Sequence, residues 1–170
     1  LHVPGAQFEP AEHPSFHPGK CARIVLADQM LGLLGELHPS LRSRYELPEA
    51  AVVAADLDMD ALLRLIPARH GVTPTPAFPP VLEDLAIVVD ESLPAASVEE
   101  VLRLAGGALL AEVRLFDLYR GEAIGAGKKS LAYALTYQAV DRTLTDTEVA
   151  ALRKNIVRAL AEKLGAQLRT

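Results

Sequence analysis

The chain has 170 residues, of which half are hydrophobic, and its 17 basic and 22 acidic side chains give a formal net charge of −5. This composition supports a packed core, and it excludes a disordered chain and a protein that coats nucleic acid through a general basic surface. No apolar run approaches the roughly 20 residues of a membrane span. The first residues lack the pattern of a signal peptide and begin with leucine, so we expect a fragment of a longer protein.

The first part of the chain is predicted to be mostly β. Its expected elements are strands over 22–27, 30–37 and 52–57, a hairpin turn at Asp28-Gln29, and a short helix over 60–66 that ends at Pro67. Residues 1–20, rich in proline and histidine, give no assignment. Three strands and one helix are too few for an independent domain, so residues 1–70 are expected to be the end of a larger sheet.

Two features of this part carry possible chemistry. Cys21 is the only cysteine, which excludes an internal disulfide and favours a buried thiol in a reducing cytoplasm over a nucleophile. His13 and His17 have a spacing that suits a metal on a helix, but prolines follow both of them directly. We therefore expect no metal site.

A proline-rich segment over 71–80 separates the two parts. It holds four prolines within seven residues, a density that neither a helix nor a central strand tolerates. We expect an extended linker.

Residues 81–170 carry clearer signals. The predicted elements are a strand over 85–89, a helix with a capping box at 97–100, strands over 109–119 and 130–138 around a glycine-containing loop, a helix with a capping box at 145–148, and a last strand over 166–169. The order β-α-β-β-α-β predicts an α+β fold, the ferredoxin-like sandwich, with both helices on one face of the sheet. The other face is left open for binding.

Seven short strings in the chain resemble one protein family. They are HPGKCARI at 17–24, LGELHP at 34–39, DLA at 84–86, FDLYRG at 116–121, KSLA at 129–132, RTLTDTEV at 142–149 and LR at 168–169. In this order and spacing they resemble the C-terminal region of the β subunit of bacterial phenylalanyl-tRNA synthetases. The resemblance implies that residues 1–70 end a non-catalytic class II synthetase-like core, and that residues 81–170 are a ferredoxin-fold anticodon-binding domain.

The resemblance also implies partners and the absence of catalysis. The expected partners are phenylalanine tRNA, the synthetase α subunit and the rest of β in a cytoplasmic (αβ)2 assembly, without a membrane. The whole enzyme would use ATP and magnesium for aminoacylation. No cofactor and no catalytic residue are expected in this fragment, because the family's aminoacylation site lies in α and its editing site in an earlier part of β.

Four residues are predicted to recognise RNA on the open face. Strand alternation places Ser130 on the exposed side and gives Asp117 and Tyr119 a common face, with Phe116 and Leu118 turned to the core. Tyr119 offers a ring for stacking, Asp117 an acceptor, Ser130 a hydroxyl, and Arg169 a planar cation. By resemblance these four sit where the family recognises the anticodon. The plainer alternatives are a strand-end aromatic, a turn carboxylate, a strand hydroxyl and a solvated charge.

Three charged positions need separate treatment. Lys128 and Lys129 are expected in the loop before the third strand, where they could approach the tRNA backbone or simply be solvated. Glu83 replaces an arginine that is usual in the family, so no RNA role is assigned to it.

Two other function classes remain open. A ferredoxin-like domain could be a small-molecule regulatory module, although residues 90–94 lack the glycine-rich turn that this reading needs. A pure interaction scaffold is the other alternative, and for residues 1–70 docking onto other parts of the synthetase is favoured over RNA contact.

Overall fold

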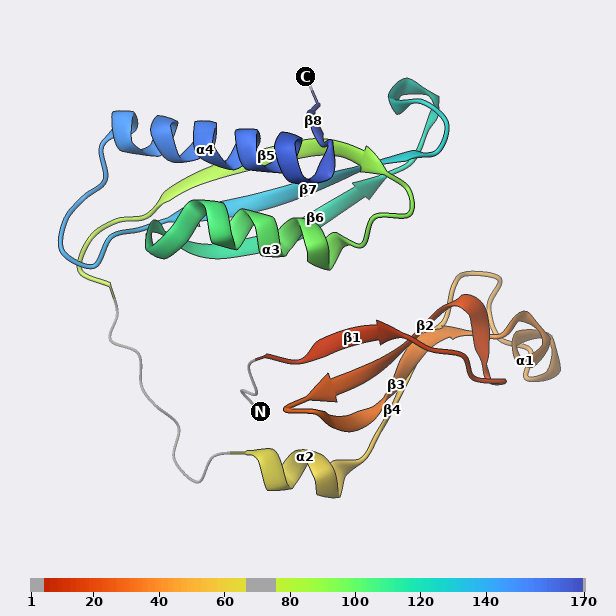
Figure 1. Cartoon of the computed structure of the whole chain (residues 1–170). Helices are drawn as coiled ribbons and strands as arrows, with labels where there is room; N and C mark the ends of the chain where they lie inside the picture. The colour runs from red at the N-terminus through yellow and green to blue at the C-terminus, as the bar shows by residue number, and fades with distance from the viewer. Residues whose placement is uncertain (1–4, 67–75, 170) are drawn as a thin grey trace. The chain divides into compact units, whose positions relative to one another are not determined.

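The computed structural model describes residues 5–66 and 76–169 and divides into two compact units, Leu1–Val72 and Thr73–Thr170 (Figure 1). The expected linker falls across this division. Its residues 71–75 lie outside the described part, and 76–80 form neither helix nor strand. No helix within the described ranges combines the length and the apolar character needed to cross a membrane.

The first unit is a four-stranded antiparallel sheet with two short helices. Its elements are β1 (Gln7–Pro10), β2 (Phe16–Leu26), β3 (Gln29–Leu37), α1 (Pro39–Arg44), β4 (Val53–Leu57) and α2 (Met59–Leu65), and the strand order is β1-β2-β3-β4. The expected strands and helix are present. β1, the beginning of β2, and α1 occupy segments for which no element was predicted. The expected helix stop at Pro67 lies outside the described residues.

The predicted hairpin between β2 and β3 is present, with its turn one residue earlier than expected. Leu26 pairs with Gln29, so the turn residues are Ala27 and Asp28, with φ values of 49° and 62°. Two residues with positive φ give the turn a twist that matches the flanking strands.

The second unit has the predicted ferredoxin-like arrangement. Its elements are β5 (Val81–Asp90), α3 (Ala95–Gly106), β6 (Leu110–Tyr119), β7 (Lys128–Tyr137), α4 (Asp146–Leu164) and β8 (Gln167–Leu168), with short 3-10 turns at Gly107–Leu109 and Glu122–Ile124. The sheet order β6-β7-β5-β8 is antiparallel throughout. α3 and α4 lie on the same face of the sheet (Figure 1).

The core of this unit lies between the sheet and the two helices. Along β7 the alternate residues Leu131, Tyr133, Leu135 and Tyr137 are at most 1 % exposed, as the strand pattern predicted. Ile156 and Leu160 of α4 are equally buried. The helices therefore cover one face and leave the other to solvent.

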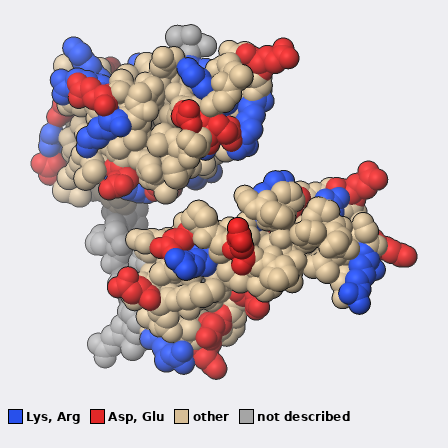
Figure 2. Space-filling model, turned by 45° about the vertical axis from the view of Figure 1, so that its right-hand side comes forward, with Lys and Arg blue, Asp and Glu red and all other residues tan. Residues whose placement is uncertain are grey.

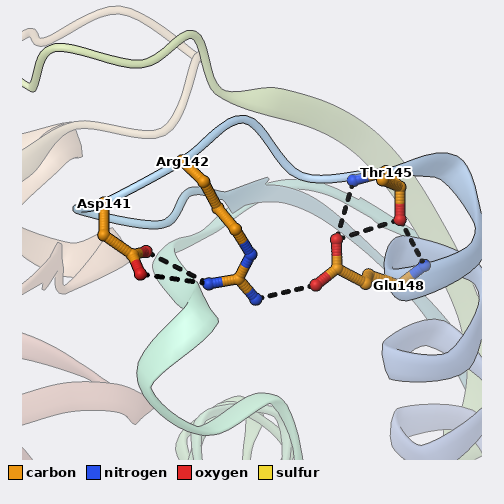
Figure 3. Close-up of polar contacts among 4 residues, drawn as sticks. All are labelled: Asp141, Arg142, Thr145 and Glu148. Carbon is orange, nitrogen blue, oxygen red and sulfur yellow. Dashed lines mark hydrogen bonds and ion pairs between the residues drawn. The ribbon is translucent and has the colours of Figure 1, made fainter.

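The capping box at the beginning of α4 is confirmed (Figure 3). The Thr145 hydroxyl accepts from the Glu148 amide at 3.3 Å, and the Glu148 carboxylate accepts from the Thr145 amide at 2.9 Å. The same carboxylate accepts from Arg142, which also contacts Asp141, so the loop before the helix is tied to its first turn. The amide of Thr145, then Arg142, then the Thr145 hydroxyl lower the pKa of Glu148 to about 2.

The capping box predicted at Ser97 is wrong. α3 begins at Ala95 with Pro94 as its N-cap, and no side chain caps it. Pro94 has an extended conformation, and the helix does not extend through it toward the N-terminus. The helix therefore begins directly after Pro94, and Ser97 lies in its first turn. The helix ends at Gly106, and Gly107 has φ 58° at the C-cap, a backbone conformation that favours glycine.

Candidate nucleic-acid interface

The helix-free face of the second unit carries most of the predicted RNA-binding residues. Strand register pairs Ser130 of β7 with Tyr119 of β6 and with Val88 of β5, and pairs Ala132 with Asp117. Directly opposed residues project to the same side of a sheet. Tyr119, Asp117 and Ser130 therefore share the face that α3 and α4 do not cover, which we call the open face.

Tyr119, Arg169 and Ser130 form a contact group on this face. The guanidinium carbon of Arg169 lies 4.7 Å from the centre of the Tyr119 ring, a distance typical of a cation–π contact. The same guanidinium is 3.5 Å from the Ser130 hydroxyl oxygen, at the long limit of a hydrogen bond. The sheet therefore brings together an aromatic ring, a planar cation and a hydroxyl.

The expectation that Ser130 is exposed is wrong. Alternation correctly places Ser130 on the open face, yet the residue is only 2 % exposed. Its neighbours account for this, because Tyr119 is its cross-strand partner and Arg169 reaches its hydroxyl. Strand periodicity gives the face of a side chain but not what covers it.

Arg169 reaches the open face because of how α4 ends. Gly165 takes the left-handed conformation at the C-cap, with φ 62°, and its amide donates to Ala161. The chain then runs along β5 as β8, and the Arg169 amide donates to the Ala86 carbonyl at 2.9 Å. This last pairing fixes the register that brings the Arg169 side chain over Ser130.

Gly121 gives the Tyr119 ring its space. A Cβ added to Gly121 would lie 2.3 Å from the Tyr119 hydroxyl oxygen and 2.6 Å from Cζ. The φ of Gly121 is 176°, which any residue adopts, so the requirement for glycine is one of space. The glycine that ends the FDLYRG string therefore allows the observed position of the ring.

Asp117 lies on the same face, two residues before Tyr119, and is exposed. Its carboxylate has no hydrogen-bond or ion-pair partner among residues 5–66 and 76–169. It is therefore available as an acceptor for a ligand on the open face.

The two lysines differ, and neither lies in the expected loop, because both belong to β7. Lys128 is exposed and pairs with Asp90 on the open side. Lys129 is 8 % exposed, shares the helix-covered side with Leu131, and donates its ammonium to the Glu91 carbonyl at 2.8 Å. The structure thus brings Lys128 to the open face and turns Lys129 away from it.

Glu83 also faces away from the open face. Its carboxylate accepts from Arg153 of α4 at 2.7 Å, on the helix-covered side of β5. Burial, with the nearby Glu83 carboxylate as a smaller cause, raises the pKa of Tyr137 well above its usual range. Glu83, which stands where the resemblance implies an arginine, thus pairs with α4 and lies away from the candidate interface.

Phe116 was predicted in the core, and this prediction is wrong. Its side chain is 49 % exposed, and it borders a hollow together with Ala132 and Arg169 on the open face. Strict alternation would give Val113 and Tyr119 the same face, yet Val113 is buried and Tyr119 is exposed, so the strand is irregular between them.

The surface is mixed in charge, and the first unit has its own hollow. In Figure 2 acidic and basic side chains are interspersed over the visible surface of both units. The hollow in the first unit is lined by Glu12, His13, His17 and His38 with three apolar neighbours. Among the described residues, no three histidine, cysteine or acidic side chains are arranged to hold a metal ion.

Two family models match the chain. Residues 76–169 match the model described as the ferredoxin-fold anticodon binding domain. Residues 1–59 match the model described as the phenylalanyl tRNA synthetase beta chain CLM domain.

Similar proteins carry the name phenylalanine–tRNA ligase beta subunit. The protein of Symbiobacterium thermophilum is 48 % identical over 170 residues, which is 100 % of this chain and 19 % of the relative. That of Moorella thermoacetica is 49 % identical over 157 residues, 92 % of this chain and 19 % of the relative. That of Corynebacterium jeikeium is 46 % identical over 162 residues, which is 94 % of this chain and 18 % of the relative. The chain spans about a fifth of the length of these relatives.

Proposed function

Since this chain belongs to the family of ferredoxin-fold anticodon-binding domains, we propose that its open face binds the anticodon of a tRNA. The observation that carries the proposal is the stacked pair of Tyr119 and Arg169 above the Ser130 hydroxyl, with Asp117 beside it. Single-stranded RNA is recognised by stacking on aromatic rings and by hydrogen bonds to splayed base edges. The open face offers both.

Each residue of the group has a distinct role in this proposal. One base stacks on the Tyr119 ring, and Asp117 accepts from an amino or imino group of a base edge. Arg169 moves from Ser130 to the RNA, where it stacks or contacts a phosphate, and this frees the Ser130 hydroxyl. The movement breaks a hydrogen bond of 3.5 Å, which is at the weak end of the range.

Lys128 extends the proposed contact toward the tRNA backbone. It is exposed at the beginning of β7, on the same side as Tyr119 and Ser130. A single ammonium acts as a point charge on a phosphate and carries no sequence information. On this face we therefore assign Lys128 to affinity and Asp117 to selectivity.

The identity of the relatives supports a wider proposal. The chain is the C-terminal part of a phenylalanine–tRNA ligase β subunit, and its tRNA is the phenylalanine tRNA. It works in the cytoplasm within an (αβ)2 assembly, with the α subunit and the rest of β as partners. ATP and magnesium serve aminoacylation elsewhere in that assembly, and this part holds tRNA without a catalytic role.

For residues 1–70 we favour a scaffold role as the end of the class II-like core. Register places Phe8, Ile24 and Leu57 on one face of the sheet, and Phe8 and Leu57 are exposed. An apolar sheet face of this kind suits packing against protein better than contact with RNA. In the complete β subunit, Phe8→Asp should reduce the amount of β that co-purifies with the α subunit. An unchanged amount would contradict the scaffold role.

The test is a titration of the chain with phenylalanine tRNA and with an anticodon-substituted copy, at low and moderate salt. Preferred binding of the natural anticodon, weakened by Tyr119→Ala or Asp117→Ala, is the expected result. Leu104→Ala, on the exposed side of α3, is the matched control and should leave binding unchanged. Equal binding of both tRNAs that disappears with salt would contradict anticodon recognition, because only phosphate contact behaves in this way.

A further inference from the structure

Phe116 is placed on the open face by an irregularity in β6. Leu115 pairs with Tyr133 on the helix-covered side, while Asp117 pairs with Ala132 on the open side. Phe116 is the extra residue between these two pairs. A bulge of this kind leaves one residue unpaired and re-aims its side chain.

The surroundings of Phe116 leave room over the sheet. Its ring borders a hollow of about 340 Å³ together with Asp84, Ala86, Ala132 and Arg169. The two alanines project from β5 and β7 on the open side and fill little of the space above the strands. Phe116 is 49 % exposed and is absent from the packed core of the unit. A large apolar ring is thus held at the surface, beside an unfilled hollow.

Arg169 connects this hollow to the Tyr119 site. Its guanidinium stacks on Tyr119 and its side chain also borders the hollow beside Phe116. Phe116 and Tyr119 are three residues apart on one strand, which is roughly 10 Å at about 3.3 Å per residue, less the shortening by the bulge. This exceeds the roughly 3.4 Å between stacked bases of one strand. Bases on the two rings would therefore be separated from each other, each with its own platform.

We infer that Phe116 is a second base-stacking platform, which takes a nucleotide of the same single strand whose other base stacks on Tyr119. The inference rests on the proposed function and deepens it. Stacking on phenylalanine accepts any base, because every base has a π-face. Phe116 therefore adds affinity and splays the strand, while hydrogen bonding at Asp117 and Ser130 supplies the selectivity.

The test uses the full chain and the anticodon stem-loop of phenylalanine tRNA, with the fluorescent base 2-aminopurine at each anticodon position in turn. With the wild-type chain, fluorescence should change on binding at two positions. Phe116→Leu keeps an apolar side chain without a ring, so it should abolish the change at one position and weaken binding about five- to a hundredfold. Phe116→Tyr keeps the ring and should retain both signals.

Two controls separate the possible failures. Tyr119→Ala should abolish the signal at the other position only, and Leu82→Ala, an exposed side chain at the far end of the open face, should change neither. Unchanged thermal unfolding of Phe116→Leu establishes that the fold is intact. If Phe116→Leu binds with both signals preserved, the second platform is overturned and anticodon binding stands. If the wild-type chain does not bind the stem-loop, the proposed function fails and the inference with it.

Discussion

The guanidinium carbon of Arg169 lies 4.7 Å from the centre of the Tyr119 ring, and it reaches the hydroxyl of Ser130, a residue 39 positions earlier in the chain. Three distant parts of the sequence thus meet at one point on the open face. β8 is the element that makes this possible, because its pairing with β5 carries the end of the chain back to the sheet. The candidate site therefore depends on the C-terminal register as much as on β6 and β7.

Arg169 is expected to act through its planar guanidinium. Arg169→Ala should weaken binding of the stem-loop about tenfold, since it removes a cation–π partner and an RNA contact. Arg169→Lys should recover only part of this loss, because an ammonium does not reproduce the planar stack. Dissociation constants at a fixed salt concentration test the prediction. Full recovery with lysine would show that only the charge matters.

Gly121→Ala is expected to impair binding without unfolding the domain. Its Cβ would collide with the Tyr119 ring, so the ring must move from its place beside Arg169. We expect a loss similar to that of Tyr119→Ala, with a nearly unchanged unfolding midpoint, since the turn is at the surface. Ala126→Val, in the same loop, is the control for added bulk. Wild-type affinity in Gly121→Ala would mean that the position of the ring is unimportant.

Substitutions of Lys128 and Lys129 should have different effects on the salt dependence of RNA binding. Lys128→Gln should reduce the slope of log affinity against log salt by about 1, the change expected for the loss of one phosphate contact. Lys129→Gln should leave this slope unchanged and lower the free energy of unfolding, because its buried ammonium donates to the Glu91 carbonyl. A reduced slope for Lys129→Gln would contradict the placement of this side chain.

The capping box of α4 predicts a defined acid sensitivity. The amide of Thr145, then Arg142, lower the pKa of Glu148 from 4.5 to about 2. A lowered carboxyl pKa contributes stability that is complete above about pH 4.5 and is lost as the pH falls toward 2. Glu148→Gln should therefore lose stability at neutral pH and show a flatter decline across this window.

Thr145→Ala should lower the free energy of unfolding by about 1 kcal/mol at neutral pH, as is typical for loss of a capping hydroxyl. Urea unfolding at several pH values measures the free energy of unfolding of both Thr145→Ala and Glu148→Gln. Asp141→Asn is the matched control, because it alters a carboxylate on the same arginine without touching the helix cap. Parallel pH profiles for Glu148→Gln and the wild type would contradict the role given to this carboxylate.

The sequence was sufficient for features that depend on local physics. The order of elements in the second unit, the alternation along β7 and the capping box at Thr145 follow from hydrophobic period and hydrogen-bonding chemistry, and all three are confirmed. The capping box predicted at Ser97 is wrong because the helix begins two residues earlier, at Ala95, directly after Pro94. A capping motif shows that a helix can begin at that residue, but it does not exclude an earlier beginning.

Features that depend on tertiary contacts could not be predicted from the sequence. The burial of Ser130 results from an arginine that arrives from the other end of the domain. The exposure of Phe116 results from a bulge, which shifts the alternation that was counted back from Tyr119. Lys129 lies under the sheet because β7 begins two residues before the predicted strand. The sequence therefore predicted which residues form the candidate site, but not how exposed to solvent each of them is.

The most direct test of the central claim is to map amide chemical shifts of the isotope-labelled chain while the anticodon stem-loop is added. If the open face binds RNA, the shifts should change at Tyr119, Ser130 and Arg169 and along the open side of β6 and β7, and those on the outer surfaces of α3 and α4 should stay unchanged. Changes concentrated on the helices, with the open face silent, would contradict the assignment of this face to RNA.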